Sequence, residues 1–322
     1  MIIEALDAKK SAYTAADVAR IYLHPTPDMY FMTFMTGVIA RMGNIGKVRV
    51  SETYTSALNS FRQFCGGRDL LFGEVTQELM MRYEAYLKAS GVSANTSSFY
   101  MRNLRAVYNR AVDSGLAARQ CPFRHVYTGV GKTAKRALAA DAIRRIKDLL
   151  LEEGSVSDLA RGIFMFSFYT RGMSFVDICY LRKTDLRDGI LTYRRKKTGQ
   201  ILSVRWERCM QQIVDRFPSV GSPYLLPILK PEQGNERRQY LNAAHLVNRH
   251  LKKLGQQLGF PARLTMYVAR HSWASIARRK NIPLSVICEA LGHDSETTTQ
   301  IYLASLDASA LDEANRRVIN EL

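Results

Sequence analysis

The sequence predicts a mainly α-helical protein with a small β-sheet, an α+β fold, divided into two domains. Apolar residues recur at helical spacing along most of the chain, and two neighbouring segments, 190–195 and 201–205, alternate apolar and polar residues as strands do. Residues 119–137 lack apolar periodicity and contain proline, glycine and several basic residues, which indicates a linker. With 322 residues, the chain is long enough for two domains with a core each.

Four helices are expected before the linker. Thr76 is a suitable N-cap for the third, a Ser or Thr is expected to cap the second, and Gly91 and Gly115 follow the third and fourth. The expected ranges are 29–42, 51–64, 76–90 and 95–114.

The fourth of these helices is amphipathic. One face carries apolar residues at helical spacing, namely Leu104, Val107, Tyr108 and Ala111. The opposite face carries polar residues, namely Arg102, Arg105 and Asn109. Such a helix buries one side and offers two guanidiniums and an amide to the groove of a nucleic acid. A solvated basic face is the alternative interpretation.

After the linker the helical pattern returns and is interrupted only by the two strands. Residues 196–200 form the turn between these strands. The expected helices are 139–151, 158–169, 175–181, 207–216, 241–258, 266–280, 284–290 and 296–303. The tail has an apolar face at helical spacing, suited to docking on a neighbouring subunit or on its own domain: Leu311, Ala314, Val318 and Ile319.

The net charge favours a polyanionic partner. Lys and Arg number 46 against 29 Asp and Glu, which leaves +17 and an isoelectric point near 9.8. Nucleic acid is the most economical partner for such a surplus, although charge alone also fits a protein that is merely basic. The N-terminus lacks a signal-peptide core and no apolar run is long enough to span a bilayer, so a cytoplasmic protein is expected.

The five cysteines are scattered and no pair has CxxC spacing. Neither a zinc site nor a disulfide framework is therefore expected, and buried reduced thiols are the expected state.

The candidate catalytic residues lie near the C-terminus. Tyr302 follows His293 by nine residues and Arg270 by 32. A guanidinium suits a phosphate, and a phenol can form a covalent ester with phosphorus and later leave. Together they predict a site that cuts and rejoins a nucleic-acid backbone. The sequence has no GxxxxGK[ST] loop and no clustered acidic metal site, so no cofactor is expected.

The strings "ARHSWAS" and "LGHDSETTTQIY" resemble the tyrosine recombinases, the phage integrase family of site-specific DNA recombinases. The string Arg-Gly-Met-Ser-Phe-Val-Asp at 171–177 resembles the branch of conjugative-transposon integrases and DNA invertases. The resemblance implies a helical, SAM-like core-binding domain and a mixed catalytic domain with the DNA breaking-rejoining fold. The implied divisions are an N-terminal segment or arm-binding extension at 1–28, the core-binding domain at 29–118, the linker at 119–137, the catalytic domain at 138–305 and a subunit-docking tail at 306–322.

The resemblance also implies an activity. A bacterial or mobile-element enzyme of this family would act in the nucleoid, as a tetramer on specific sites in double-stranded DNA, with a DNA-bending accessory protein as a candidate partner. It would integrate, excise or invert a DNA segment through a 3′-phosphotyrosine intermediate, without metal or ATP.

The site residues follow by motif. Tyr302 resembles the nucleophile, Arg270 the arginine that binds both non-bridging phosphate oxygens, and His293 the imidazole that donates to one of them. Lys197, on the turn between the strands, resembles the lysine that protonates the leaving 5′ oxygen. Lys196 and Arg195 compete with it, and Lys197 is favoured because it directly precedes Thr198 and Gly199.

Two departures from the family pattern concern phosphate binding. Ser174 stands where the family's first arginine is expected, and Arg171 would reach the same pocket if the segment turns helically. Arg194 and Arg195 are the next candidates. Tyr267 replaces a histidine three residues before the second arginine, which leaves more of the proton transfer to the lysine.

Two further residues are assigned supporting roles by the resemblance: Asp177 would orient the pocket, and His271 would lie behind it or in the core. The residues expected to contact DNA are Arg102, Arg105, Asn109, Lys132, Lys135, Arg136, Arg195 and Lys196. A type IB-like topoisomerase and a DNA-binding regulator with a weakened site remain as alternatives.

Overall fold

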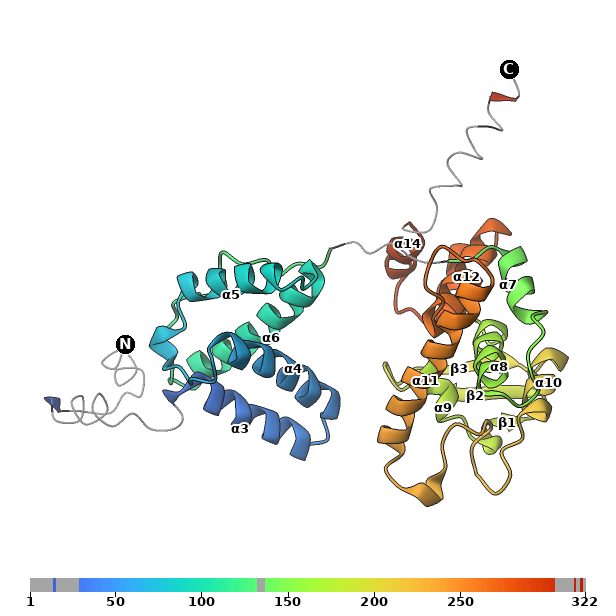
Figure 1. Cartoon of the computed structure of the whole chain (residues 1–322), viewed down its shortest axis with the longest axis horizontal. Helices are drawn as coiled ribbons and strands as arrows, with labels where there is room; N and C mark the ends of the chain where they lie inside the picture. The colour runs from blue at the N-terminus through green and yellow to red at the C-terminus, as the bar shows by residue number, and fades with distance from the viewer. Residues whose placement is uncertain (1–13, 16–28, 132–136, 305–315, 317–318, 321–322) are drawn as a thin grey trace. The chain divides into compact units, whose positions relative to one another are not determined.

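The computed structural model of this chain describes residues 14–15, 29–131, 137–304, 316 and 319–320, except for the side chains of 301, 302 and 304. It separates into two compact units, Met1–Lys132 and Thr133–Leu322 (Figure 1). The predicted mainly helical fold with one small sheet is confirmed within these residues.

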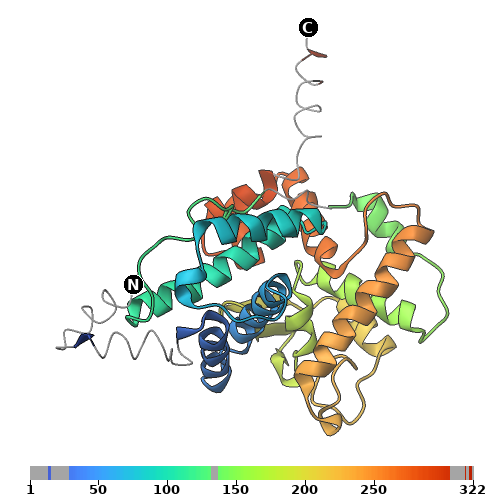
Figure 2. The same cartoon turned by 60° about the vertical axis from the view of Figure 1, so that its left-hand side comes forward.

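The first unit contains the four predicted helices. They are α3 (Phe31–Asn44), α4 (Val48–Phe64), α5 (Gln77–Ala89) and α6 (Ala94–Asp113). α3 and α4 lie side by side in both views (Figures 1 and 2). Aromatic rings fill the core, where Phe31 packs edge to face on Phe61 at 5.8 Å between ring centroids and Phe61 packs on Tyr83 at 5.1 Å.

The predicted N-cap is confirmed at α5 and wrong at α4. The Thr76 hydroxyl accepts the Leu79 N–H, and Ser93 accepts the Thr96 N–H. α4 begins at Val48 without a side-chain cap, so the expectation of a Ser or Thr cap near residue 51 is wrong. At α3 the carboxylate of Asp69 accepts the N–H groups of residues 32 and 33 at 2.8 and 2.9 Å, a cap supplied from a distant loop.

The first unit extends further than predicted. Phe123 and Val126 lie in the expected linker, yet both are buried in the core of this unit. The Asn95 side chain binds both the N–H and the carbonyl of Gly131 at 2.7 and 3.1 Å. The start of the linker at residue 119 is therefore wrong, because apolar burial and hydrogen bonds hold the chain to the first unit as far as residue 131.

The second unit is built on a three-stranded antiparallel sheet in the order β1-β2-β3. The strands are β1 (Leu186–Arg187), β2 (Ile190–Arg194) and β3 (Ile201–Arg205). Leu191 pairs with Val204 and Tyr193 with Leu202 on the covered face. Both predicted strands are confirmed; β1 is only two residues long and has no period to detect.

Eight α-helices of the described residues belong to this unit. They are α7 (Ala140–Lys147), α8 (Val156–Tyr169), α9 (Phe175–Cys179), α10 (Arg208–Arg216), α11 (Glu236–Gln257), α12 (Met266–Arg279), α13 (Leu284–Leu291) and α14 (Glu296–Ala304). α8 is apolar on most sides and contacts α7, α9, α10, α11 and α12. Within the described residues no helix is both long and apolar enough to cross a membrane.

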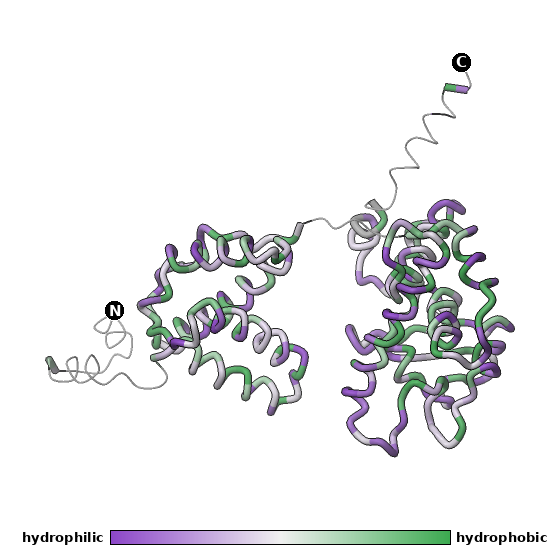
Figure 3. The backbone as a smooth tube through the Cα atoms, in the orientation of Figure 1, coloured by the Kyte–Doolittle hydropathy of each residue, from purple (hydrophilic) through white to green (hydrophobic). Residues whose placement is uncertain are grey.

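Two of these helices differ from prediction by more than two residues at one end. α7 ends at Lys147 rather than at residue 151, and α11 begins at Glu236, five residues before the predicted start. The early start is a hydrophilic stretch, purple in Figure 3, and apolar periodicity cannot detect it. The side chain of Asn235 caps it by accepting the Arg238 N–H at 3.0 Å.

All five cysteines are free thiols, as predicted. Cys179 and Cys288 are buried, and burial raises the pKa of Cys179. Cys121 is exposed, which contradicts the expectation that the thiols are buried.

Candidate active site

Arg270 is a buried arginine held by three different segments. Its side chain extends from α12 and the residue is 7% exposed. One terminal nitrogen donates to the Gly172 carbonyl at 3.1 Å, and the other donates to the Leu291 carbonyl at 2.6 Å. The second nitrogen also lies 3.2 Å from Nε2 of His293. These contacts fix the plane of the guanidinium.

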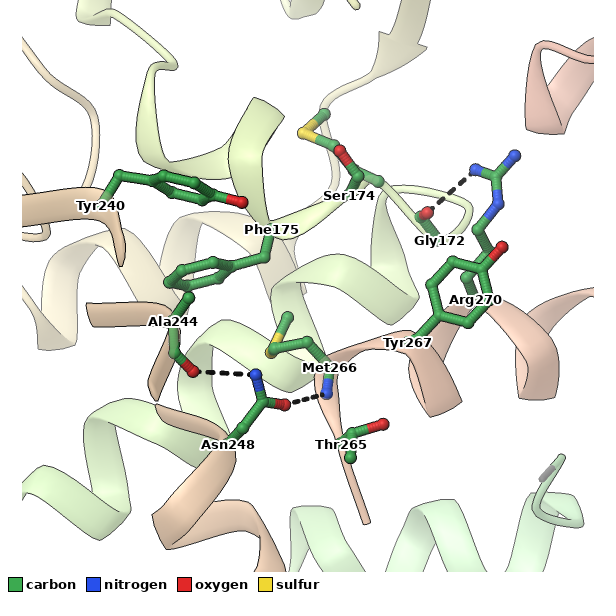
Figure 4. A pocket seen from close by; sticks show the side chains of 11 residues that line it. Gly172, Ser174, Phe175, Tyr240, Ala244, Asn248, Thr265, Met266, Tyr267 and Arg270 are labelled. Carbon is green, nitrogen blue, oxygen red and sulfur yellow. Dashed lines mark hydrogen bonds between the residues drawn. The ribbon is translucent and has the colours of Figure 1, made fainter. Parts of the chain in front are cut away.

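The loop between α8 and α9 lies directly against Arg270 (Figure 4). At Gly172 the backbone has φ +78°, and a Cβ there would lie 2.7 Å from the Cα and Cγ of Arg270. Only glycine permits both this conformation and this approach.

His293 connects Arg270 to α14. Gly292 ends α13 in the left-handed conformation, with φ 62°, and so turns the chain toward the site. The Nδ1 of His293 lies 2.8 Å from the Thr299 hydroxyl of α14. Burial, followed by the positive charges of Arg270 and Arg195, lowers the pKa of His293 to about 4. The imidazole is therefore neutral at pH 7.

Asp177 holds the turn between β2 and β3. Its carboxylate, 4% exposed, accepts the backbone N–H of Lys196 at 2.8 Å and the Ser174 hydroxyl at 2.6 Å. The ammonium of Lys196 lies 4.3 Å from the centre of the Tyr180 ring. Lys197 is exposed, and its charge is among those that lower the pKa of His293.

The segment around Arg171 is not helical. The expectation that a helical turn would bring Arg171 to the pocket of the first arginine is therefore wrong. α8 ends before it, and Arg171 itself has φ 60°. Its guanidinium lies 3.4 Å from the Ser203 carbonyl of β3, at the limit of a hydrogen bond. Ser174 begins α9 as its N-cap and gives its hydroxyl to Asp177.

Arg195 brings a second guanidinium, besides that of Arg270, close to His293. It donates a hydrogen bond to the carbonyl of Gly292, the residue preceding the imidazole. Arg194 instead donates to the Gly199 carbonyl within the turn, at 2.7 Å. The turn conformation thus separates neighbouring arginines that the sequence could not distinguish.

Tyr267 and Arg270 extend from α12 into one cavity of about 320 Å³ (Figure 4). Tyr267 is 55% exposed, and its ring meets the buried ring of His271 edge to face at 4.5 Å. Polar and aromatic groups both line this cavity: Gly172, Ser174, Phe175, Tyr240, Asn248 and Arg270. Among the described residues no three His, Cys, Asp or Glu side chains gather as a metal site.

α14, the helix that contains Tyr302, is held to His293 and to α13. Leu303 of this helix is buried with Ile287 and Leu291 of α13, and Thr299 bonds to His293. The side chain of Tyr302 lies outside the described part of the structure. Thr299 was not among the predicted site residues, because a threonine three residues before a tyrosine is too common to signal a role.

Comparison with known proteins now decides the family. Residues 136–309 match the phage integrase family, and residues 30–126 match the phage integrase SAM-like domain. The chain belongs to the phage integrase family. The predicted tyrosine recombinase, a site-specific DNA-recombining enzyme, is thereby confirmed.

Two similar proteins are named tyrosine recombinases. Tyrosine recombinase XerA of Pyrococcus furiosus is 24% identical over 242 residues, which cover 74% of this chain and 79% of that protein. Tyrosine recombinase XerD of Pseudomonas aeruginosa is 22% identical over 264 residues, covering 78% and 85%.

Solved integrases share the fold. A lambda integrase dimer bound to a COC′ core site superposes with a TM-score of 0.64 at 15% identity, over 94% of this chain and 84% of that one. The Tn1549 transposon integrase in complex with transposon right end DNA gives 0.64 at 15%, over 91% and 99%. A lambda integrase tetramer bound to a Holliday junction gives 0.66 at 16%, over 92% and 87%.

The first unit of the recombinase presents the predicted polar face of α6. The apolar face of α6 is buried, as predicted, and Arg102, Arg105 and Asn109 on the opposite face are exposed. Arg105 donates to the Thr128 hydroxyl at 3.2 Å, and with Arg124 it lines a cavity of about 410 Å³. The other predicted DNA contacts in this region, Lys132, Lys135 and Arg136, lie outside the described residues.

Proposed function

We propose that this recombinase cleaves and rejoins DNA through a 3′-phosphotyrosine at Tyr302. The observation that carries the proposal is the pair of contacts that links Arg270 to His293 and His293 to α14. A buried guanidinium and a neutral imidazole meet at 3.2 Å, and the same imidazole bonds to the helix that bears the tyrosine.

Each group has a role in a balanced reaction. The Tyr302 oxygen loses its proton to solvent and bonds to phosphorus, while the bond from phosphorus to the 5′ oxygen breaks. Arg270 and His293 contact the non-bridging oxygens, where negative charge grows. Lys197 supplies the proton that the leaving 5′ oxygen takes. Attack by a new 5′ hydroxyl reverses these steps, so the ester conserves the energy of the broken bond.

We assign the missing first arginine to Arg195 rather than Arg171. Arg195 bonds to Gly292 next to His293, whereas Arg171 reaches toward Ser203. Asp177 supports this assignment, since it holds the backbone of the turn on which Arg195 and Lys197 lie. Tyr267 is the proposed neutral donor in place of the usual histidine.

An alanine comparison tests that assignment. We expect Arg195→Ala to slow strand cleavage roughly 100-fold, because a preorganised donor is lost, and Arg171→Ala to slow it less than about fivefold. Cleavage rates at saturating protein separate the two. The reverse ranking would return the role to Arg171.

The proposed substrate is double-stranded DNA carrying specific recombination sites. The net charge of +17, the exposed guanidiniums of α6 and the DNA-bound integrases of the same fold support it. A tetramer on DNA, docking through the tail at 306–322, is proposed by analogy with the lambda integrase tetramer. Integration, excision or inversion is the proposed outcome, in the bacterial nucleoid and with a DNA-bending protein as a candidate partner.

The proposed nucleophile is tested by trapping the covalent adduct. After a nicked suicide substrate is cleaved, the short strand that carries the 5′ hydroxyl dissociates. Rejoining is then impossible, so the wild-type enzyme should accumulate a protein–DNA adduct at its target site. Tyr302→Phe should form none, because the attacking oxygen is absent. Tyr169→Phe, which removes the phenolic oxygen of a tyrosine that lies in this unit but does not line the cavity of Arg270, is the matched control and should retain the adduct.

Two other results would change the interpretation. An adduct that survives in Tyr302→Phe would place the nucleophile elsewhere. Site-specific binding without any adduct in the wild-type protein would favour a DNA-binding regulator.

A further inference from the structure

The hydrogen bonds of His293 define which of its nitrogens carries the proton. An arginine side chain only donates hydrogen bonds, so the Nε2 that lies 3.2 Å from Arg270 is an acceptor. The neutral ring then holds its proton on Nδ1, which donates to the Thr299 hydroxyl at 2.8 Å. Thr299 is completely buried, whereas His293 is partly exposed, so solvent can still exchange protons with the ring.

This resting arrangement is the wrong one for the proposed chemistry. To donate to a phosphate oxygen, Nε2 must carry the hydrogen. A phosphate that engages the guanidinium of Arg270 removes the donor that faces Nε2 and offers an acceptor in its place. The favourable form of the ring then has its proton on Nε2 and a bare Nδ1 that needs a donor.

A hydroxyl can satisfy both forms of the ring. It accepts a hydrogen bond from a protonated Nδ1, and after rotation it donates to a bare Nδ1. A carbonyl in the same place would accept only, and an amide N–H would donate only. The Thr299 hydroxyl therefore permits the ring to change between its Nδ1–H and Nε2–H forms, whereas a backbone carbonyl or N–H in its place would favour one form only.

We propose that Thr299 is a positioning residue for His293, whose hydroxyl holds the imidazole and lets it change from the Nδ1–H to the Nε2–H form when a DNA phosphate binds Arg270. One proton leaves Nδ1 for solvent and one arrives at Nε2 from solvent, so the ring stays neutral. This inference rests on the proposed function of Arg270 and His293.

The same bond couples the imidazole to the helix of the nucleophile. Thr299 precedes Tyr302 by three positions on α14, which is about one helical turn. Leu303 fixes the next part of α14 in the small core shared with α13. Loss of the hydroxyl should therefore act on the chemical step and not on DNA binding.

Two substitutions at this position separate the hydroxyl from the packing. Thr299→Val keeps the branched shape but removes the hydroxyl, and Thr299→Ser keeps the hydroxyl. We expect Thr299→Val to slow cleavage of the suicide substrate about 10- to 100-fold, the range for partners that orient functional histidines, and Thr299→Ser to stay within about threefold. DNA binding by gel shift should match the wild type in both.

A double-mutant cycle shows whether Thr299 acts through His293. In a His293→Ala background, Thr299→Val should cause no further loss, because the partner it positions is gone. Histidine nitrogen NMR gives a readout independent of activity: free wild-type protein should show His293 protonated on Nδ1, and Tyr302→Phe protein bound to its DNA site should show Nε2–H. The His293→Ala spectrum assigns the resonance among the six histidines.

The outcomes distinguish this inference from the proposed function. If the wild-type enzyme forms no adduct, the proposed function fails whatever position 299 does. If it forms the adduct and Thr299→Val cleaves at the wild-type rate, only the role of Thr299 is overturned. If the losses of cleavage rate from Thr299→Val and His293→Ala multiply in the double variant, Thr299 acts independently of His293 and its role is purely structural. An unchanged His293 tautomer on DNA binding would also overturn the proposal.

Discussion

Arg270→Lys is expected to lower the rate of strand cleavage by about 1000-fold. The ammonium of a lysine cannot contact two phosphate oxygens in one plane as the guanidinium can. The substitution also removes donors from the Gly172 and Leu291 carbonyls, which are 3.1 and 2.6 Å from the arginine nitrogens. Single-turnover cleavage at saturating protein measures the effect on chemistry apart from DNA affinity.

Arg278→Lys is the matched control. Arg278 lies on the same helix but is exposed, so the identical substitution there should leave the cleavage rate within about twofold. A folded Arg270→Lys enzyme that cleaves within tenfold of wild type would mean that the phosphate is bound elsewhere.

Gly172→Ala is expected to destabilise the second unit by about 3 kcal/mol and to abolish cleavage. Roughly 1–2 kcal/mol comes from placing an L residue at φ +78°, and a similar amount from the overlap with Arg270 at 2.7 Å. The overlap is with the Cα, Cβ and Cγ of the arginine, so relief requires the Arg270 side chain to move. Urea unfolding followed by tryptophan fluorescence reports this unit alone, since both tryptophans, Trp206 and Trp273, lie in it.

Gly189→Ala separates the two contributions. Gly189 also has a positive φ, +70°, in the turn between β1 and β2, but a Cβ there would meet nothing within 4 Å. We expect a loss of about 1 kcal/mol and unchanged cleavage. Equal destabilisation by the two substitutions would show that the contact with Arg270 adds no constraint.

Local chemistry in the sequence predicted most of the elements. Apolar periodicity identified α6 and its buried face, and alternation identified β2 and β3. Errors occurred where distant groups decide the outcome. Asp69 supplies the cap of α3 from another segment, and Phe123 joins the first core from within the expected linker.

The sequence by itself determined the family and the candidate groups Arg270, His293 and Tyr302, because these residues recur at a spacing set by the motif. Only the tertiary structure shows that Arg195, and not Arg171, bonds beside His293, which is the basis of our proposal for Arg195, and only it revealed Thr299. The choice depends on the left-handed backbone at Arg171 and on carbonyls far away along the chain. Hydrogen bonds between distant segments have no period or motif, so they become visible only when folding brings their donors and acceptors together.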